Sequence, residues 1–312
     1  MSRSGVDPVG AALVARTHRR VGPRVRRTPV IELPWSGGGR LVLKLESLQH
    51  AGSFKARGAM AQVLDVPGGL PIVAASGGNF GAAAAWAAAA LGRQATVFVP
   101  EVTGVAKRER ILEFGGDLRV GGAVYADAQR AADEFAASTG GALIHPYEPA
   151  AMIAGGGSCG LEFEEQAGPL DTVVVAVGGG GLMAGVSAWF GPRSHLVAVE
   201  TEGTQALHAA LEAGLPVDVE VSGIAADALG ATRIGSRPLA GLRRWVNRSV
   251  VLSDLDVRAA QRWLWTELRV VAEPSGATAL AAVLSGRVVI GPASRVGVIV
   301  CGANTDRLPT DD

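Results

Sequence analysis

The chain has 312 residues, enough for about two domains of roughly 150 residues each, and its 29 Lys and Arg residues balance 29 Asp and Glu residues. This zero formal charge argues against nucleic acid or an anionic membrane as the main partner, because such binding depends on an excess of basic residues. A hydrophobic content of 48% with 19% charged residues excludes a disordered or fibrous chain.

Short apolar runs alternate with Ala-rich or amphipathic stretches, a pattern typical of β-α units around parallel sheets. The first set of predicted strands comprises Leu41–Leu45, Ile72–Ala75, Ala95–Val99, Leu118–Val120 and Ala142–Ile144. The second set comprises Thr172–Val177, Leu196–Val199, Val250–Leu252 and Val296–Val300. Helices are predicted between the strands, including Gly81–Leu91, Ala126–Ala137, Leu182–Trp189 and Asp256–Leu268. The two sets indicate two α/β domains, with boundaries near residues 40 and 145.

The sequence gives no sign of a signal peptide or a membrane anchor. Residues 66–92 and 172–192 form uncharged stretches long enough to span a bilayer, but glycine clusters interrupt both, and a strand followed by a helix explains them. The N-terminus lacks the apolar stretch and small-residue cleavage site of a signal peptide. Two cysteines, Cys159 and Cys301, cannot form a disulfide framework. We therefore expect a cytoplasmic protein without membrane partners.

Two predicted strands run directly into glycine-rich turns that begin helices. Residues 76–80, with the sequence Ser-Gly-Gly-Asn-Phe, follow Ile72–Ala75, and four glycines, Gly178–Gly181, follow the strand that starts at Thr172. Backbone N–H groups at such a helix start converge on one point and favour an anion there. For the first turn, a simple strand-to-helix connection capped by Asn79 explains the pattern equally well. Four glycines in succession favour a phosphate.

The second glycine turn also fits a dinucleotide-binding pattern. Residues 179–184 read Gly-Gly-Gly-Leu-Met-Ala, which matches G-x-G-x-x-A, and Glu200 lies about 20 residues further on, where a ribose-binding acid is expected. The glycine turn can therefore also be interpreted as the dinucleotide-binding turn of an NAD-binding oxidoreductase.

Two further residues have side chains suited to chemistry. Lys55 lies among small and apolar residues, and a partly desolvated lysine favours the neutral amine that Schiff-base chemistry requires. An ordinary lysine on a helix surface is the competing interpretation. Cys301 follows the strand Val296–Val300, at the end where α/β sheets bind ligands, although buried free cysteines usually serve only in packing.

The four segments occur together in one order, and this combination resembles the fold-type II pyridoxal-phosphate enzymes, most closely the serine/threonine dehydratase branch. The segments are Ser53-Phe54-Lys55, Ser76-Gly77-Gly78-Asn79, Gly178–Gly181 and Cys301-Gly302-Ala303-Asn304. Supporting stretches are residues 27–30, 43–46, 145–147, 160–162, 223–227 and 273–277. The resemblance covers nearly the whole chain.

The resemblance implies two parallel-sheet domains, each with three αβα layers, of the tryptophan-synthase-β-like fold. Residues 41–145 would form the smaller domain, and residues 1–40 with 146–312 would form the larger, cofactor-binding domain. The active site would lie in the cleft between them. A homodimer is the habit of the family, and the C-terminal regulatory domain of biosynthetic threonine dehydratases would be missing.

The resemblance also assigns the site residues. Lys55 would bind pyridoxal 5′-phosphate as a Schiff base, Phe54 would flank its ring, and Asn79 would bond the 3-oxygen of the ring. Cys301 would face the pyridine nitrogen. The phosphate would rest on Gly178, Gly179, Gly180 and Gly181, and the substrate carboxylate on the backbone of Ser76, Gly77, Gly78, Asn79 and Phe80.

Glu200 matches an acid that contributes to a cation site in several relatives. The usual second acidic partner is Ala206 here, so a monovalent ion, a divalent ion held by one acid fewer and a purely structural Glu200 all remain open.

The implied reaction is the dehydration and deamination of a β-hydroxy amino acid, such as L-threonine or L-serine, to a 2-oxo acid and ammonia. A β-replacement synthase and an amino-acid racemase are the alternatives with the same cofactor. Gly77 stands where racemising relatives carry a serine, which favours elimination. Phe80, Gly156 and Ser158 differ from the usual residues, so a larger or less polar β-substituent on the substrate stays open.

Overall fold

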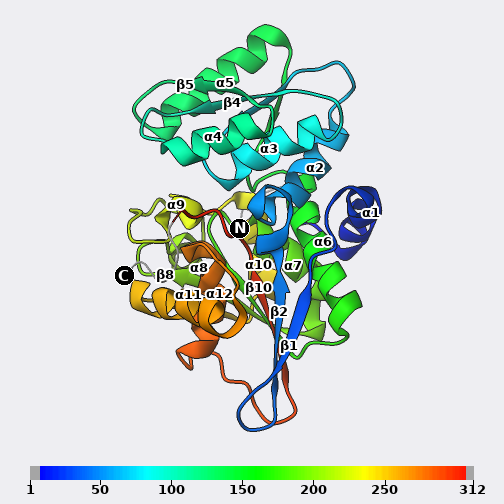
Figure 1. Ribbon diagram of the computed structural model, residues 1–312, viewed down its shortest axis with the longest axis vertical. Coiled ribbons are helices and arrows are strands. Elements are labelled where there is room, and N and C mark those ends of the chain that lie inside the picture. The colour runs from blue at the N-terminus through cyan, green and yellow to red at the C-terminus, as the bar shows by residue number, and fades with distance from the viewer. Residues whose placement is uncertain (1–7, 307–312) are drawn as a thin grey trace.

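A computed structural model of the protein describes residues 8–306, which form two open sheets (Figure 1). The larger sheet has the order β1 (Val30–Pro34), β2 (Arg40–Leu45), β10 (Arg295–Val300), β7 (Thr172–Ala176), β8 (His195–Thr201) and β9 (Arg248–Leu252). The smaller sheet has the order β5 (Asp117–Val120), β4 (Ala95–Val99), β3 (Ile72–Ala75) and β6 (Ala142–Ile144). Neighbouring strands are parallel except β1 and β2. The predicted α/β class with two mainly parallel sheets is confirmed.

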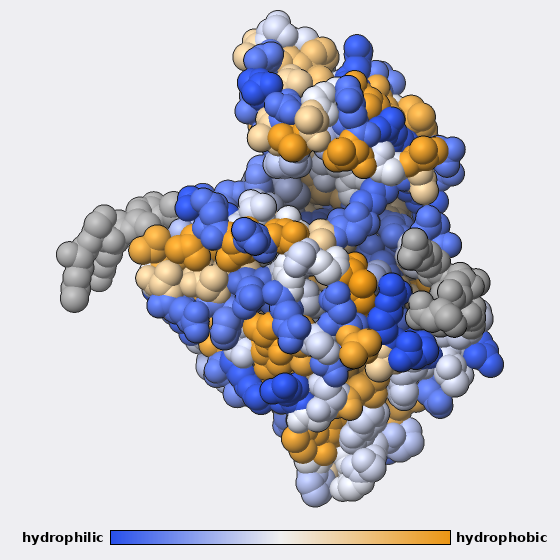
Figure 2. Space-filling model, turned by 90° about the vertical axis from the view of Figure 1, so that its left-hand side faces the viewer, coloured by the Kyte–Doolittle hydropathy of each residue, from blue (hydrophilic) through white to orange (hydrophobic). Residues whose placement is uncertain are grey.

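Helices cover both faces of each sheet (Figure 1). The space-filling view shows the surface indented between the upper part, which holds the smaller sheet, and the broader lower part (Figure 2). The helices beside the larger sheet are α1 (Ala11–Val21), α6 (Ala150–Ala167), α7 (Gly181–Phe190), α8 (Ala206–Ala213), α9 (Ala226–Leu229), α10 (Ser236–Trp245), α11 (Asp254–Leu268) and α12 (Pro274–Leu284). Those beside the smaller sheet are α2 (Lys55–Asp65), α3 (Asn79–Ala89), α4 (Val105–Glu113) and α5 (Tyr125–Thr139). None of the helices in residues 8–306 combines the length and the hydrophobicity needed to cross a bilayer.

Strand β3 shows how the two faces of the smaller sheet are filled. Ile72 and Ala74 belong to the core under α2 and α3, whereas Val73 and Ala75 pack with α5. Successive side chains of a strand point to opposite faces, so a strand covered on both sides is apolar at every position. This continuous apolarity is what made the strands visible in the sequence, and every predicted strand and helix end lies within two residues of the observed one.

One strand lies in the other sheet. The segment 41–45 was expected with the smaller set, but β2 pairs with β1 and β10 in the larger sheet, with Leu43 opposite both Ile31 and Val298. The expectation is wrong because β10, the partner that decides the placement, lies at the far end of the chain. The boundary near residue 40 therefore does not hold for β2. The outer ends of the predicted larger domain, residues 1–7 and 307–312, lie outside the described residues.

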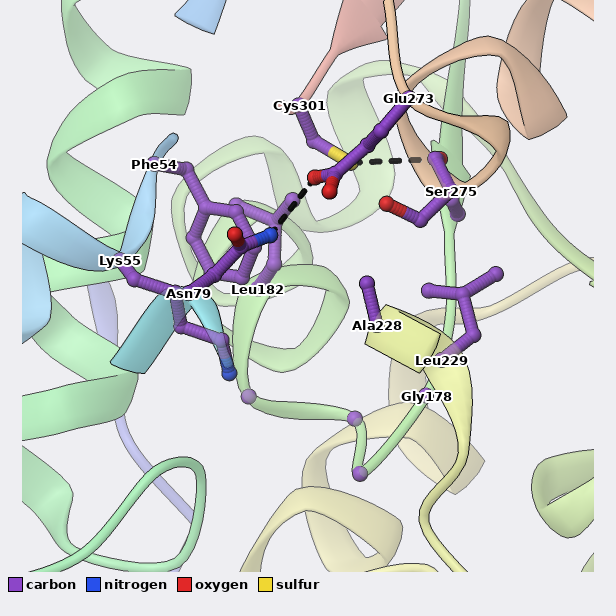
Figure 3. Close-up of a pocket in the computed structure, with 14 residues that line it drawn as sticks. Phe54, Lys55, Asn79, Gly178, Leu182, Ala228, Leu229, Glu273, Ser275 and Cys301 are labelled. Atoms are coloured by element: carbon purple, nitrogen blue, oxygen red, sulfur yellow. Dashed lines mark hydrogen bonds between the residues drawn. The ribbon is translucent and has the colours of Figure 1, made fainter. Parts of the chain in front are cut away.

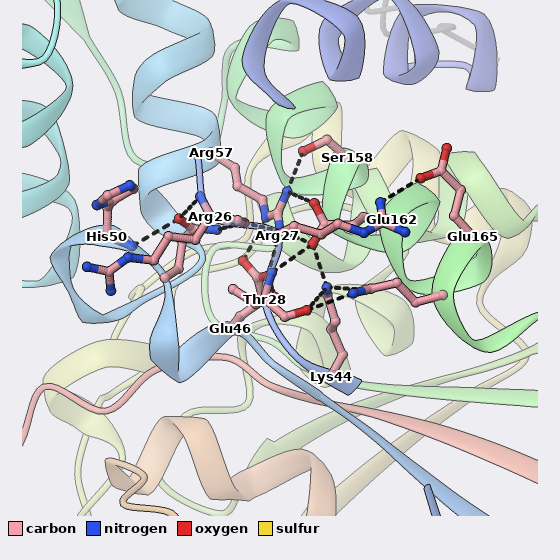
Figure 4. A network of polar contacts seen from close by, with 12 residues as sticks. Arg26, Arg27, Thr28, Lys44, Glu46, His50, Arg57, Ser158, Glu162 and Glu165 are labelled. Carbon is pink, nitrogen blue, oxygen red and sulfur yellow. Dashed lines mark hydrogen bonds and ion pairs between the residues drawn. The ribbon is translucent and has the colours of Figure 1, made fainter. Parts of the chain in front are cut away.

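Four buried charged side chains connect β2 to α2 and α6 (Figure 4). Lys44 contacts Glu162 at 2.5 Å, and Arg57 contacts Glu46 at 2.7 Å and Glu162 at 2.9 Å. None of the four side chains is more than 3% exposed. Burial opposes the charge of Arg57, but Glu46 and Glu162 outweigh it and raise the pKa of the guanidinium. The two positive and two negative charges thus neutralise one another.

This network fixes the start of α2. Arg57 lies two residues after Lys55, the first residue of the helix, and its guanidinium donates to both oxygens of Glu46. Lys44 donates to the Thr28 carbonyl oxygen, and the Thr28 hydroxyl donates to Glu46. The segment before β1, the strand β2 and the helix that carries Lys55 are therefore held together by hydrogen-bonded charges.

Replacement of Arg57 with Met would leave two buried carboxylates with Lys44 as their one cationic partner in the network. We expect Arg57→Met to lower the free energy of unfolding by about 3–5 kcal/mol, because an unpaired charge cannot be solvated in the core. Urea denaturation monitored by circular dichroism measures the loss. The control is Arg110→Met, which breaks an exposed pair with Glu113 and should cost less than about 1 kcal/mol. Equal losses in the two variants would contradict the assigned role of the network.

Candidate active site

The turn that precedes α2 is fastened to the end of β10. The N–H of Phe54 donates to the carbonyl oxygen of Cys301 at 3.0 Å, and Ser53 forms an antiparallel bridge with Gly302. On the other side of the bridge, the N–H of Ala303 donates to the Gly52 carbonyl oxygen at 2.9 Å. These backbone contacts bring Lys55 close to Cys301, although the two residues are far apart in the sequence.

A pocket between the two sheets collects most of the predicted site residues (Figure 3). Phe54, Lys55 and Asn79 line one side, and the glycine turn after β7 lines another. The predicted residues in the lining are Phe54, Lys55, Asn79, Gly178, Gly179, Gly180, Gly181 and Cys301. Residues without a predicted role there are Ala176, Leu182, Ala228, Leu229, Glu273 and Ser275. The pocket is therefore formed by one group of residues beside the smaller sheet and another beside the larger sheet, which come together only in the fold.

Lys55 is the only basic side chain among the residues that line this pocket. Its Nζ donates to the Pro146 carbonyl oxygen at 2.8 Å and lies 5.0 Å from the centre of the Phe54 ring. Burial lowers the pKa of Lys55 to about 8, against the opposing influence of Cys301 and Glu273. The neutral, nucleophilic amine therefore becomes available at a much lower pH than for an ordinary lysine.

The glycine turn presents unused backbone donors. Within the described chain, no group accepts a hydrogen bond from the N–H groups of Gly178 to Met183, which stand at the N-terminus of α7. Glycine is needed because a Cβ at Gly178 would lie 2.9 Å from the Leu229 backbone, and one at Gly179 would overlap the Tyr147 ring. Gly180 has a φ of +89°. Consecutive N–H groups at a helix start form a cradle for a phosphate-sized anion.

Cys301 is a neutral thiol in its surroundings. Its Sγ donates to the carbonyl oxygen of Ser275 at 3.4 Å. Burial, together with the nearby Glu273, raises the pKa of Cys301 to about 12. The amine can bond the aldehyde of a phosphorylated pyridine aldehyde, the glycine turn can hold its phosphate, and the Phe54 ring and the neutral thiol can stand beside its ring. The residues present therefore fit pyridoxal phosphate.

The turn after β3 is only partly as predicted. The N–H groups of Gly77, Gly78, Asn79 and Phe80 donate to no group of the described chain. The N–H of Ser76, however, donates to the Phe98 carbonyl oxygen at 3.2 Å, so this N–H group is already used within the fold. It is used because Ser76 extends the pairing of β3 with β4. Of these five residues only Asn79 lines the pocket, and the Phe80 side chain is buried in the core.

Glu273 and Ser275 are pocket residues that sequence reasoning missed. They belong to the stretch 273–277, which was matched only as support for the resemblance. Glu273 accepts from Nδ2 of Asn79 at 2.6 Å, and it is 4% exposed. The available signal was an acid placed directly before a proline that starts a helix, but the contact with Asn79 depends on how the two sheets are arranged.

Glu200 serves as a helix cap. Its two oxygens accept from the N–H groups of Leu207 at 2.7 Å and His208 at 2.8 Å, in the first turn of α8, and the residue is fully buried. Glu200 is fully buried and is not among the residues that line the pocket at the glycine turn, so the oxidoreductase alternative lacks its ribose-binding acid. The two helix-cap contacts support a structural role for Glu200 over a role in cation binding. Within residues 8–306, no group of three or more His, Cys, Asp or Glu side chains could hold a metal ion.

Known proteins provide a family and a fold for comparison. A family model described as pyridoxal-phosphate dependent enzyme matches residues 21–302. Phenylserine dehydratase from Ralstonia pickettii is 35% identical, over 94% of this chain and 92% of that protein. Serine racemase from Arabidopsis thaliana is 32% identical, over 94% and 92% respectively. The crystal structure of a threonine deaminase from T.th. matches with a TM-score of 0.89 at 33% identity, covering 96% of this chain and 99% of that one.

The chain has three lysines, Lys44, Lys55 and Lys107, so chemical labelling of amines can be read residue by residue. In protein freed of bound cofactor, we expect labelling of Lys55 to rise through a midpoint near pH 8, because the amine loses its proton there. An ordinary lysine requires a pH of about 10.4. Mass spectrometry of the Lys55 peptide measures the midpoint. Labelling in urea is the control, and a native midpoint as high as the unfolded one would contradict the prediction.

Proposed function

The chain belongs to the fold-type II pyridoxal-phosphate-dependent enzymes of the serine/threonine dehydratase-like family, and we propose that it converts a β-hydroxy amino acid to a 2-oxo acid and ammonia. One observation carries the proposal: a single pocket combines the Lys55 amine, the Cys301 thiol and a turn of four glycines with unused N–H groups. The similarity to a phenylserine dehydratase and to a threonine deaminase supports the choice of reaction.

Each of these residues would contact a different part of the cofactor. Lys55 would bond its aldehyde carbon, the Gly178–Gly181 turn would hold its phosphate, and Phe54 would cover a face of its ring. Asn79 would donate to the 3-oxygen, and Cys301 would face the ring nitrogen. When bound, pyridoxal phosphate withdraws electrons from the α-carbon of an amino acid. A neutral thiol, unlike a carboxylate, does not hold the ring nitrogen in its protonated form, which suits prompt loss of a β-substituent.

Lys55 would carry the proton through the reaction. Once the amino group of the substrate has replaced it, the Lys55 amine is neutral above a pH of about 8 and can take the proton from the α-carbon. A β-hydroxyl group is a poor leaving group until it is protonated, and the Lys55 ammonium can return the proton to it, so that water leaves. The enamine that is released reacts with water to give the 2-oxo acid and ammonia.

The turn after β3 would bind the substrate carboxylate. Four N–H groups, from Gly77 to Phe80, stand unused at the N-terminus of α3, where the helix dipole favours an anion. A carboxylate held there lies on the smaller-sheet side, opposite the residues contributed by the larger sheet. Binding at this turn would orient the α-carbon toward Lys55.

Racemisation is the second candidate, because a serine racemase is similar over most of this chain. A racemase needs a second acid or base on the opposite face of the substrate. Gly77, at the position where racemising relatives carry serine, has no side chain, and a Cβ there would lie 2.7 Å from the Thr103 hydroxyl oxygen. Thr103 thus occupies the space that a serine would need, which favours elimination.

Phe80, Gly156 and Ser158, which differ from the usual residues of the family, do not line the pocket. Phe80 is buried in the core, and Ser158 donates to the Gly155 carbonyl oxygen. Gly156 faces the first turn of α7. Apolar side chains from two helices beside the larger sheet, Leu182 of α7 and Leu229 of α9, line the pocket instead. Together with the similarity to a phenylserine dehydratase, they support an apolar β-substituent.

Purified enzyme tests the function directly. We expect a yellow protein whose absorption band is bleached by borohydride, and which forms 2-oxo acid and ammonia from phenylserine faster than from L-serine or L-threonine. The variant Lys55→Ala should lose both the band and turnover, because no other pocket residue can supply the amine. A colourless protein that binds NADH, or normal ammonia release by Lys55→Ala, would overturn the proposal.

Chiral chromatography of the same reactions separates elimination from racemisation. We expect little D-serine from L-serine, and Gly77→Ser alone should add little because the new side chain meets Thr103. The double variant Gly77→Ser with Thr103→Ala has room for the hydroxyl and should form more D-serine than the matched control Thr103→Ala. Efficient formation of D-serine by the unmodified enzyme would make the racemase the better description.

A further inference from the structure

Glu273 is the only acidic side chain among the residues that line the pocket, and neither the mechanism nor the sequence motifs assign it a task. It stands directly before α12, and its N–H donates to the Gly302 carbonyl oxygen at 3.2 Å. Any side chain on Gly302 would overlap the Glu273 carboxyl group. The carboxyl group is therefore fixed beside the segment that carries Cys301, and in Figure 3 it points to the Asn79 amide.

A chain of three side chains determines how the Asn79 amide is turned. Nδ2 of Asn304 donates to the Ala51 carbonyl oxygen at 2.8 Å and to Oδ1 of Asn79 at 2.6 Å. Asn79 must therefore direct its oxygen toward Asn304 and its nitrogen toward Glu273, which accepts at 2.6 Å. An amide nitrogen has two N–H groups. One is used by Glu273, and the second remains for a molecule in the pocket.

The titratable groups around Glu273 come from four elements. Lys55 of α2 and the neutral Cys301 thiol after β10 share the pocket with it. Asp227 of α9 and Lys107 of α4, which form an ion pair, also act on its charge. Burial raises the pKa of Glu273 to about 7, although the hydrogen bonds from Asn79 and Ser275 favour the carboxylate. As the pH falls through about 7, the Glu273 group that accepts the hydrogen bond from Asn79 thus changes from a carboxylate to a neutral carboxylic acid.

We propose that Glu273 is a positioning residue for the reaction: its carboxyl group holds the Asn79 amide in the one orientation that leaves an N–H for the ring of the bound cofactor. The inference rests on the proposed function, because Asn79 needs that orientation only if the pocket holds pyridoxal phosphate. Glu273 acts through Asn79, and its charge state sets how firmly the amide is held. Asn304 completes the arrangement from the opposite side.

The test compares Glu273→Gln and Glu273→Ala with the unmodified protein and with Glu267→Gln, a matched change of an exposed acid on α11. Pyridoxal phosphate is titrated into each cofactor-free protein, and its dissociation constant and absorption spectrum are recorded on both sides of neutral pH. Glutamine keeps an acceptor for Asn79 but cannot gain or lose a proton. Alanine removes the acceptor and leaves the amide free to rotate.

We expect Glu273→Ala to bind pyridoxal phosphate about tenfold more weakly, the effect of one lost buried hydrogen bond. Glu273→Gln should bind within about threefold of the unmodified protein and lack its spectral transition near pH 7. Unchanged affinity in Glu273→Ala, or an unchanged transition in Glu273→Gln, would overturn the inference. If Glu273→Ala fails to fold, the presence or absence of the spectral transition in Glu273→Gln decides the test. Absence of a borohydride-sensitive band in all four proteins would refute the proposed function itself, and this inference with it.

Discussion

The four buried charges of Lys44, Glu46, Arg57 and Glu162 define where Lys55 stands. In a core that excludes water, each charge is stable only while its partners remain in contact, and Arg57 bonds two carboxylates at once. Helix α2 cannot slide or turn without breaking one of these contacts. Because α2 also packs on α3 and α6, the same network fixes the smaller sheet relative to the larger one at the point where Lys55 enters the pocket.

The pocket exists because the ends of parallel strands meet at one edge of each sheet. Strand β7 ends in the glycine turn, β10 ends at Cys301, and β3 ends at the turn that starts with Ser76. The bridge between Ser53 and Gly302 joins the chain before α2 to the end of β10. The Asn79–Glu273 hydrogen bond then crosses from the smaller sheet to the larger one, so the site is complete only when both sheets contribute.

Local patterns in the sequence predicted the strands and both glycine turns, because continuous apolarity and helix-starting glycines are properties of neighbouring residues. Placement in a sheet is not local. Strand β2 was assigned to the wrong sheet because its partner β10 lies at the other end of the chain. Strand β1, an edge strand without a buried residue, lacks the continuous apolar run by which the other strands were predicted. The role of Glu273 likewise depends on a contact with Asn79 that only the packed fold creates.

Burial of both charged residues in the pocket brings their proton affinities close together. The pKa values of Lys55 and Glu273 are about 8 and about 7, whereas an ordinary lysine and glutamate differ by about 6 units. Near neutral pH, neither group therefore strongly prefers its charged form. Elimination needs one proton to be taken from carbon and returned to oxygen. An amine with such a balanced affinity, beside a neutral thiol, suits both halves of that transfer.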